Sequence, residues 1–350
     1  MQINDLINQT SEWLKGTGPN SDIVISSRIR LARNLNKLPF PHWASKGQLN
    51  EVIEKTTQAL FKIDLLKKAT LFELANLDSI DKQFLVERHL MSIEHTQKTE
   101  QKAVLVNDEE NIAVMINEED HLRIQLMQSG FNLFEAWNII NGIDDTLAKL
   151  LDYAYLPDFG YLTACPTNTG TGMRGSVMLH LPALVMSRQI ERVLAAIAKL
   201  SFTTRGLYGE GTQASGNFFQ ISNQVSLGHS ENEIIENINS LIRQIIEQET
   251  QARQIMLAKS KDVLEDRINR SLGILKSARI ITSQETIELL SMVRLGSDLG
   301  MIKDIDRRTI NELFIITQPA HLQKLENKKL SQSERDLTRA ELIRKKLNLL

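Results

Sequence analysis

Short runs of alternating apolar and polar residues dominate the chain from residue 21 to about residue 230. Residues two apart share one face of a strand, so the run at 22–31 places its isoleucines on one side and its arginines on the other. Further strand-like runs lie at 103–106, 111–116, 160–165, 176–181 and 217–224. Because several of these runs are joined by short turns, we expect an antiparallel sheet and not a series of βαβ units.

Apolar residues spaced three and four positions apart predict helices elsewhere. We expect helices at about 47–69, 119–155 and 183–200, and a short N-terminal helix with Trp13 and Leu14 on its apolar face. From residue 231 onward the spacing is helical throughout, and Ser230 and Glu233 form a helix start signal. These patterns predict an α+β fold: an N-terminal helix at 1–20, an antiparallel β-sheet flanked by helices at 21–245, and an all-helical C-terminal domain at 246–350.

Composition narrows the functional classes. The 350 residues carry a formal net charge of −2, which gives no general attraction to nucleic acid or an anionic membrane. Cys165 is the only cysteine, which excludes an intrachain disulfide and is typical of a reducing compartment. The N-terminus lacks a signal-peptide pattern, and no apolar run is long enough to cross a bilayer. We therefore expect a cytoplasmic protein that contacts neither nucleic acid nor membrane directly.

Arginines and acidic residues stand at the ends or on the polar faces of the predicted strands. Ser26, Arg28 and Arg30 share one face, and two guanidinium groups fixed on one strand suit a polyphosphate. A solvated sheet face would show the same spacing. The string NEEDHLRI (117–124) offers Glu118 and Glu119 to a cation, with Arg123 one helical turn beyond, although acidic runs also occur in plain turns.

Two glycine-rich strings complete the candidate chemistry. CPTNTGTGMRG (165–175) matches G-x-G-x-x-G, but the dinucleotide-binding fingerprint needs a following helix, and a strand is expected here. RGLYGEGT (205–212) places Arg205 and Glu210 around a second glycine turn. Taken singly, each string is compatible with an ordinary loop, and Cys165 with a small buried side chain.

In this order and at these separations, SSRIR, NEEDHLRI, CPTNTGTGMR and RGLYGEG resemble the catalytic domain of the phosphagen (guanidino) kinases, over roughly residues 21–245. The resemblance implies ATP as phosphoryl donor, with Mg²⁺ on its phosphates, and a guanidinium group as acceptor. It implies that Glu119 and Glu210 hold the guanidinium, that Cys165 lies beside it, and that Glu118 reaches Mg²⁺ through water. The nucleotide-binding residues that it implies are Ser26, Ser27, Arg28, Ile29, Arg30, His89, Arg123, Arg174, Gly175, Ser176, Val177, Met178, Arg205, Gly206, Leu207, Tyr208 and Gly209.

In three features the sequence departs from the phosphagen kinases and resembles the bacterial protein arginine kinases. SSRIR begins at Ser26, which leaves no room for the helical domain that precedes the core in phosphagen kinases. Met178 stands where kinases of small substrates usually have a histidine, and a helical region follows the core. The resemblance implies arginine side chains of proteins as acceptors, which require an open site.

The string ERDLTRAEL (334–342) resembles the R-D-x-x-R-A pattern of the same kinases, where it forms a phosphoarginine pocket. Here the pocket would consist of Arg335, Asp336, Arg339 and Ala340, with the two arginines four apart on one helix face. A charged helix face gives the same spacing. The resemblance also implies three partners: a zinc-binding activator protein, a stress-response transcriptional repressor and a Clp-type protease that degrades marked proteins. The apolar segment 271–302 predicts either a homodimer interface or the core of its own domain.

The chemistry of the acceptor suggests roles for the two carboxylates. A guanidinium has a pKa above 12 and is a poor nucleophile while protonated. A carboxylate can orient it through paired hydrogen bonds and take its proton. We expect Glu119 to be the base, Glu210 to be the second clamp and Cys165 to assist positioning. The alternatives are a phosphagen kinase acting on free arginine and a non-catalytic regulator that binds phosphoarginine.

Overall fold

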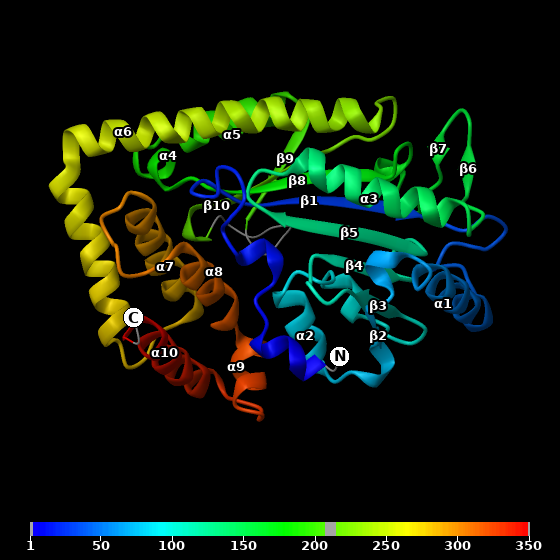
Figure 1. Cartoon of the computed structure of the whole chain (residues 1–350), viewed down its shortest axis with the longest axis horizontal. Helices are drawn as coiled ribbons and strands as arrows, with labels where there is room; N and C mark the ends of the chain where they lie inside the picture. Colours follow the sequence, from blue (N-terminus) through cyan, green and yellow to red (C-terminus); the bar gives the residue numbers. More distant parts are fainter. Residues whose placement is uncertain (1–2, 207–214, 349–350) are drawn as a thin grey trace.

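An eight-stranded antiparallel sheet lies at the centre of the structure, a computed structural model that describes residues 3–206 and 215–348 (Figure 1). Its strand order is β2-β3-β4-β5-β1-β8-β10-β9, so β1 occupies a central position between β5 and β8. The strands are β1 (Val24–Arg33), β2 (Thr70–Glu73), β3 (Ala103–Val106), β4 (Ile112–Ile116), β5 (Leu122–Ser129), β8 (Met173–His180), β9 (Phe202–Arg205) and β10 (Phe218–Asn223). The antiparallel sheet predicted from the alternating runs is confirmed.

Helices cover one face of this sheet and form a separate group beyond it (Figure 1). The helices α3 and α6 pack on β1, β5 and β8, and together they bury the largest apolar cluster among the described residues. The helices are α1 (Lys46–Leu60), α2 (Ser79–Glu87), α3 (Leu133–Ala148), α4 (Pro182–Met186), α5 (Ile190–Lys199), α6 (Glu231–Ser277), α7 (Ser283–Asp298), α8 (Arg307–Ile316), α9 (Pro319–Leu325) and α10 (Gln332–Asn348).

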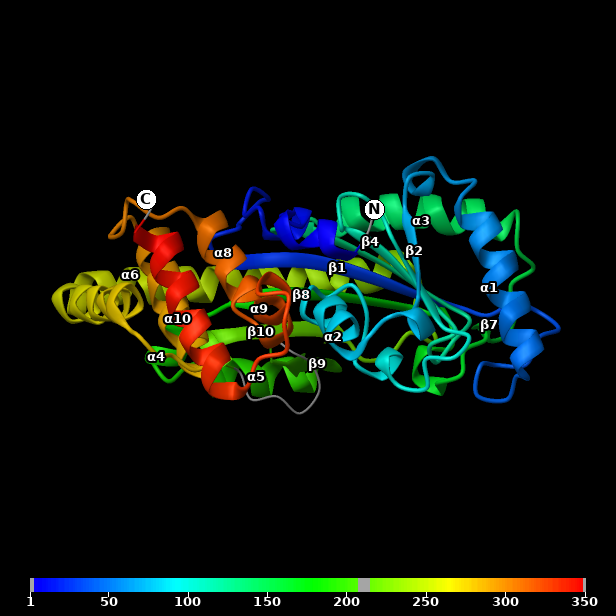
Figure 2. The same cartoon turned by 90° about the horizontal axis from the view of Figure 1, so that it is seen from below.

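The opposite face of the sheet is covered only at its two sides. At one side, α2 packs on β3 and β4 through Phe84 and Leu85. At the other, α7, α8 and α10 form their own apolar cluster with the second half of α6. Figure 2 views the molecule from this face and shows α2 beside α9, a contact that the structure also records. The middle of the face, on β1, β5 and β8, carries mostly polar and charged side chains, together with Met127 and Met178.

The predicted helix at 119–155 is wrong in its first part. Residues 122–129 form β5, and α3 begins only at Leu133. The reason is a period of two: Leu122, Ile124 and Leu126 are buried on the helix-covered face while the intervening residues face the other way. Because β5 pairs with both β4 and β1, Arg123 lies on a strand and not one helical turn beyond Glu119.

Two further expectations need correction. The N-terminal segment forms two short 3-10 helices, Ile3–Asn8 and Glu12–Leu14, because Leu6 packs in the α2 cluster and Trp13 in the C-terminal cluster. Of the predicted strand at 160–165 only β7 (Gly160–Tyr161) forms, paired with β6 (Tyr155–Leu156) outside the main sheet. The next backbone groups bind side chains instead, since Asn34 donates to the Leu162 carbonyl and Asp120 accepts from the Ala164 amide.

The C-terminal half begins as the sequence predicts. The Ser230 side chain caps α6 by accepting from the Glu233 amide at 3.3 Å, and the Glu233 carboxylate accepts from the Ser230 amide. The proposed domain boundary at 245/246 lies inside α6, whose backbone leaves helical geometry at Ser260 (φ −147°, ψ 34°), so this boundary stays a prediction. Segment 271–302 contributes side chains to the C-terminal apolar cluster, and its role as a homodimer interface stays a prediction. None of the helices in 3–206 and 215–348 is long and apolar enough to span a membrane.

The sheet is tied to α3 by a buried ion pair, which yields a stability prediction. Arg33 on β1 is 1% exposed, and its terminal nitrogen lies 2.7 Å from a carboxylate oxygen of Asp144. Asp144→Ala leaves this guanidinium buried without its counter-charge, so the free energy of unfolding is expected to fall by about 3–5 kcal/mol. Urea denaturation measures the loss.

The matched control is Glu51→Ala, which removes the exposed Glu51–Lys55 pair of α1 and is expected to cost at most about 0.5 kcal/mol. Equal losses in the two variants would contradict the assignment of Arg33–Asp144 as the tie between β1 and α3.

Candidate active site

Guanidinium groups gather in the middle of the uncovered sheet face. Arg28 and Arg30 project from β1, and Arg174 on β8 lies directly opposite Arg30 in the register. Arg123 on β5 lies opposite Ala32. Arg205 ends β9 at the nearby sheet edge, and its charge acts on Arg28. The sheet register thus brings together all five arginines that the family resemblance implies for nucleotide binding.

These arginines repel one another. Burial, followed by the charges of Arg205, Arg123 and Arg174, lowers the pKa of Arg28 to about 10. Burial, followed by the charge of Arg28 and then those of Arg123, Arg174 and Arg205, holds the pKa of Arg30 well below its usual value. Within the described residues, the buried Nε of Arg30 has no hydrogen-bond partner. A concentrated positive field with an unused donor on Arg30 is suited to a multiply charged anion.

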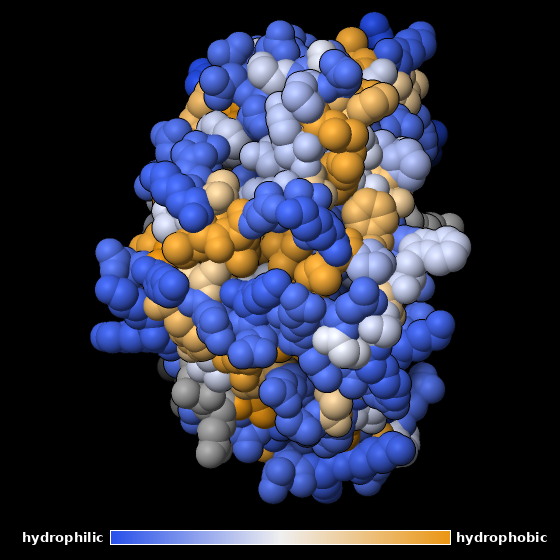
Figure 3. All heavy atoms as spheres, turned by 90° about the vertical axis from the view of Figure 1, so that its right-hand side faces the viewer, coloured by the Kyte–Doolittle hydropathy of each residue, from blue (hydrophilic) through white to orange (hydrophobic). Residues whose placement is uncertain are grey.

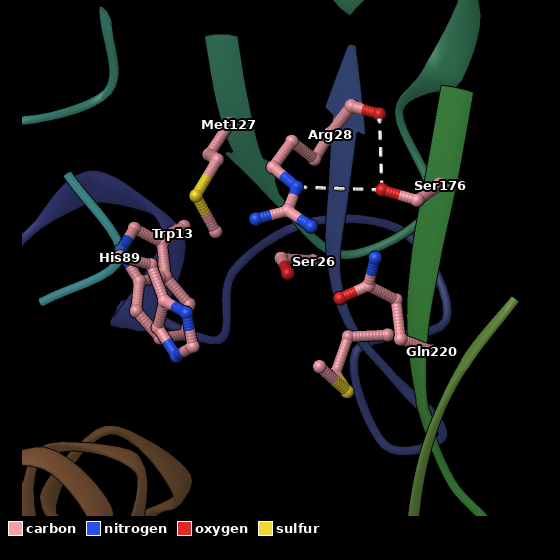
Figure 4. A pocket seen from close by; sticks show the side chains of 8 residues that line it. Trp13, Ser26, Arg28, His89, Met127, Ser176 and Gln220 are labelled. Atoms are coloured by element: carbon pink, nitrogen blue, oxygen red, sulfur yellow. Dashed lines mark hydrogen bonds between the residues drawn. The ribbon is translucent and has the colours of Figure 1, made fainter. Parts of the chain in front are cut away.

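A narrow pocket opens beside Arg28 (Figure 4). Trp13 and His89 stand on one side, and Ser26 and Gln220 stand across from them. His89 adopts a positive φ of 59°, and its carbonyl accepts from Gln125 at 2.6 Å. Burial, with the Arg28 charge, lowers the pKa of His89 to about 3, so the imidazole is neutral. The full lining is Trp13, Ser26, Arg28, His89, Met127, Ser176, Met178 and Gln220.

The acidic turn before β5 meets the arginine cluster through Arg123. Arg123 lies 2.8 Å from Glu118 and 3.1 Å from Glu119, which brings the carboxylates next to the cationic face. The Glu119 side chain is 43% exposed. Burial raises its pKa, the Arg123 charge opposes that rise, and the Asp120 and Glu118 charges add to it. Glu119 is thus an accessible carboxylate with enhanced basicity.

Glu118 is held differently. Its side chain is 3% exposed, and its oxygens accept from Ser92 at 2.6 Å, from the Glu119 amide at 3.1 Å and from Arg123. Burial works against its ionised form, yet Arg123 and these hydrogen bonds outweigh it and lower the pKa. Among residues 3–206 and 215–348 no cluster of three or more His, Cys, Asp or Glu could hold a metal ion. Because both oxygens of Glu118 are already engaged, a magnesium contact through water stays a prediction.

Asp120 joins the Glu119 turn to the Cys165 turn, and His121 joins it to the segment after β1. Sequence reasoning gave neither residue a role. Asp120 Oδ1 accepts from Asn34 Nδ2 and from the Ala164 amide, both at 2.7 Å. His121 Nδ1 accepts from the Leu35 amide at 3.0 Å, and its Nε2 donates to the Pro39 carbonyl at 2.9 Å. Both residues belong to the string NEEDHLRI. The partners of Asp120 lie 86 and 44 positions away in the chain, so the spacing of neighbouring residues could not predict these contacts.

Cys165 itself is half-buried at the start of the 3-10 helix Pro166–Asn168. Its Sγ lies 3.0 Å from Thr167 Oγ1. Gly172, at φ +61°, lets the glycine-rich turn approach β1, because a Cβ there would lie 2.6 Å from the Ala32 carbonyl oxygen. A strand, β8, follows this turn as predicted, in place of the helix that a dinucleotide-binding fingerprint requires.

Some of the expected nucleotide-binding residues point away from the arginine face. The Ile29 and Val177 side chains are buried in the helix-covered core, and Ser27 bonds to the Gly130 carbonyl at 2.9 Å. A Cβ at Gly175 would meet Ile238 of α6. These four positions can offer only backbone groups to a ligand on the other face. Gly206 is described and buried, whereas Leu207, Tyr208, Gly209 and Glu210 lie outside the described residues.

The expected phosphoarginine pocket lies on α10, away from this face. Arg339 is 1% exposed and donates to the carbonyls of Thr317 and Ile281, each at 2.9 Å, and to Asp336. Arg335 donates to the Leu330 carbonyl at 2.9 Å, and Ala340 is buried. Arg339 therefore joins α7, α8 and α10 in this structure, and its use as a phosphate ligand stays a prediction.

Fold and site together define a guanidino-group phosphotransferase. The sequence profile described as "ATP:guanido phosphotransferase, C-terminal catalytic domain" matches residues 51–252. The crystal structure of a lombricine kinase superposes with a TM-score of 0.59 at 25% identity, covering 71% of this chain and 76% of that one. A taurocyamine kinase from Schistosoma mansoni, at 23% identity and a TM-score of 0.60, shares the fold over 82% of this chain and 42% of its own.

The relatives over the full length are more specific. The protein-arginine kinase of Halothermothrix orenii is 49% identical over 350 residues, 100% of both chains. That of Bacillus subtilis is 47% identical, covering 97% of this chain and 94% of its own. The profile described as "Protein-arginine kinase McsB C-terminal domain" matches residues 261–350. The chain belongs to the protein-arginine kinase family, and it is a kinase that acts on a guanidino group.

The mutual repulsion of the arginines predicts a conflict between stability and ligand binding. Arg30→Met removes one charge of the cluster, so we expect the free energy of unfolding without nucleotide to rise by about 1 kcal/mol. The same variant should lose the rise in melting temperature that ATP confers on the unaltered protein. Thermal denaturation with and without ATP measures both effects.

Arg33→Met on the same strand is the control. Arg33 is paired with Asp144, so this variant is expected to unfold at lower temperature in either condition. If Arg30→Met were as destabilising as Arg33→Met, the arginine cluster would not be under electrostatic strain.

Proposed function

We propose that this kinase transfers the γ-phosphoryl group of ATP to arginine side chains of proteins, at the site between the arginine cluster and Glu119. The observation that carries the proposal is Arg123, which belongs to the cationic face and lies 3.1 Å from the accessible carboxylate of Glu119. The phosphates of the donor need positively charged residues around them, and the guanidinium acceptor needs a carboxylate. Arg123 contacts Glu119 and belongs to the arginine cluster, so the donor and acceptor sites adjoin there.

On the donor side, the protein has to stabilise the negative charge of the ATP phosphates and align the γ-phosphoryl group with the acceptor. Arg28, Arg30 and Arg174 are fixed by the register of β1 and β8, so their positions cost no rearrangement when the nucleotide binds. The pocket beside Arg28 would take the nucleoside end of ATP against His89. Mg²⁺ would travel on the nucleotide phosphates and offset part of their charge.

On the acceptor side, Glu119 binds the substrate guanidinium and receives a proton from it. As the guanidino nitrogen attacks, its bond to the γ-phosphorus forms and the bond between that phosphorus and the β,γ-bridging oxygen breaks, which releases ADP. The proton lost from the nitrogen passes to Glu119, whose pKa is raised by burial. Glu210 is proposed as the second guanidinium clamp, and Cys165 as a positioning group beside the acceptor.

The exposure of Glu119 favours a protein-borne acceptor. With 43% of its side chain accessible, the carboxylate can be reached by an arginine that projects from a polypeptide. The names of the full-length relatives agree with this acceptor. We further propose that the modification marks proteins for a Clp-type protease and acts in stress-response control, with a zinc-binding activator and a transcriptional repressor as partners. That part of the proposal rests on the family resemblance alone.

The proposed base is tested by Glu119→Gln, which keeps the size of the side chain and removes the proton acceptor. We expect kcat to fall at least about 100-fold, by analogy with the loss of one preorganised transition-state group. Mass spectrometry at neutral pH scores phosphoarginine on an unfolded protein, because a P–N bond is labile to acid. Near-normal turnover would remove Glu119 from the role of base.

The same assay distinguishes acceptors. Product on protein arginines and none on free arginine supports the proposal, and product on free arginine alone supports a phosphagen kinase. Binding of a phosphoarginine peptide without turnover of ATP would support a non-catalytic regulator.

The pH dependence of kcat/KM gives a second test of Glu119. A base must be ionised, so activity should be lost as the pH falls through its pKa in the folded protein. Because burial raises that pKa above the ordinary value of 4.5, the acid limb should lie above pH 4.5. Residual activity of Glu119→Gln should lack this limb, and an unchanged limb in the variant would assign it to another group.

A further inference from the structure

Trp13 brings an unused hydrogen-bond donor to the pocket beside Arg28. It lies in the 3-10 helix Glu12–Leu14, is 3% exposed, and lines the pocket together with His89. The two rings meet edge to face, with centroids 5.3 Å apart and planes at 79° (Figure 4). The indole Nε1 is buried and has no hydrogen-bond partner in the described parts of the chain.

The residues around Trp13 hold it firmly in place. Arg88 forms a buried pair with Glu110 at 2.6 Å and also donates to Ser11 at 3.1 Å. On the other side, the Ser129 amide at the end of β5 donates to the Glu12 carboxylate at 3.1 Å. The N-terminal segment is thus bound at two consecutive residues, Ser11 and Glu12, to Arg88 and to the end of β5. These contacts fix the 3-10 helix that carries the indole.

Packing alone does not account for the choice of tryptophan here. The Trp13 ring also belongs to the C-terminal apolar cluster, a role that phenylalanine would fill. A buried indole N–H usually finds a partner, and leaving it unpaired costs about 1–3 kcal/mol. A ligand that carries an acceptor atom into the pocket would remove this cost.

The surroundings define the class of ligand. Arg28 and the arginine cluster lie at one side and take phosphates, while Met127, Met178 and the ring of His89 offer weakly polar surfaces to a flat group. An anion with a heteroaromatic end satisfies both sides, as ATP does. We propose that Trp13 binds the nucleoside end of ATP, with its Nε1–H donating to an acceptor atom of the base or the ribose. The inference rests on the proposed placement of ATP and adds a residue that lies outside the matched catalytic region 51–252.

Nuclear magnetic resonance of the full-length protein labelled with ¹⁵N-tryptophan reads this hydrogen bond directly. The chain has three tryptophans, and Trp43, at 78% exposed, serves as an internal reference. Mg-ADP is expected to move the Trp13 indole signal, which is identified by its absence in Trp13→Phe. Inorganic tripolyphosphate carries the phosphates without the nucleoside and should leave that signal in place. The shift itself is read on the unaltered protein, so the variant serves only to assign the signal.

Calorimetric titration gives the affinity. Trp13→Phe keeps the ring and removes the donor, so we expect the Kd for Mg-ADP to rise about 5–10-fold and the Kd for tripolyphosphate to stay unchanged. Trp43→Phe is the matched control and should bind both ligands as the unaltered protein does. Arg28→Ala should weaken binding of both.

The outcomes separate this inference from the proposed site. Unchanged binding of Mg-ADP in a folded Trp13→Phe, with loss in Arg28→Ala, overturns the role of Trp13 and retains the phosphate site. If neither variant weakens binding, the proposed placement of ATP fails, and the role of Trp13 fails with it. A Trp13 signal that moves equally with tripolyphosphate and with Mg-ADP also overturns the inference, since no nucleoside atom would then be needed.

Discussion

The site depends on keeping several arginines charged and partly buried at the centre of a sheet. Burial and mutual repulsion both act against Arg28 and Arg30, and their lowered pKa values record it. The strand backbone places both guanidinium groups on one face, because side chains two apart along a strand point the same way, and pairing with β5 and β8 fixes that strand. The free energy that holds β1 in place comes from the other face, where Ile29 and Leu31 are fully buried against α3 and α6. Alternate side chains of β1 therefore serve different purposes. Those on the helix-covered face stabilise the fold, and those on the other face are available to bind a ligand.

Sequence reasoning succeeded where local pattern and tertiary environment agree. The two-residue period of β1 placed Arg28 and Arg30 on one face, and the capping residues Ser230 and Glu233 located the start of α6. It failed at β5, where residues 122–129 form a strand and not the predicted helix, although the acidic turn before them resembles a helix start. There the period of two in LRIQL was the better guide, and the pairing of β5 with β1 and β4 was decisive.

Other parts of the site had no local signal. The link from Asp120 to Ala164 and the clamp of His121 on Leu35 and Pro39 join segments far apart in the chain. A single sequence offers no way to see such contacts, because each partner looks like an ordinary turn residue. Trp13 shows the same limitation, since its helical context predicts only packing, while its contribution to the pocket depends on where β1, β5 and α2 meet. The family resemblance supplied the residues that share a pattern and could not supply these.

Three consecutive residues at the end of α2 connect the pocket with the C-terminal helices. Glu87 accepts from the Ala320 amide at 2.9 Å and the His321 amide at 3.1 Å, where a carboxylate suits the N-terminus of α9. Arg88 is paired with Glu110, and His89 forms the pocket wall. Two residues before α9 begins, the Thr317 carbonyl accepts from Arg339 of α10. Covalent and hydrogen bonds therefore run without a gap from α10 through α9 to His89, so a displacement of α9 would be felt at the pocket within two residues. These contacts tie the C-terminal helices to the pocket wall, so a change at the start of α9 would act on His89 through Glu87 and Arg88.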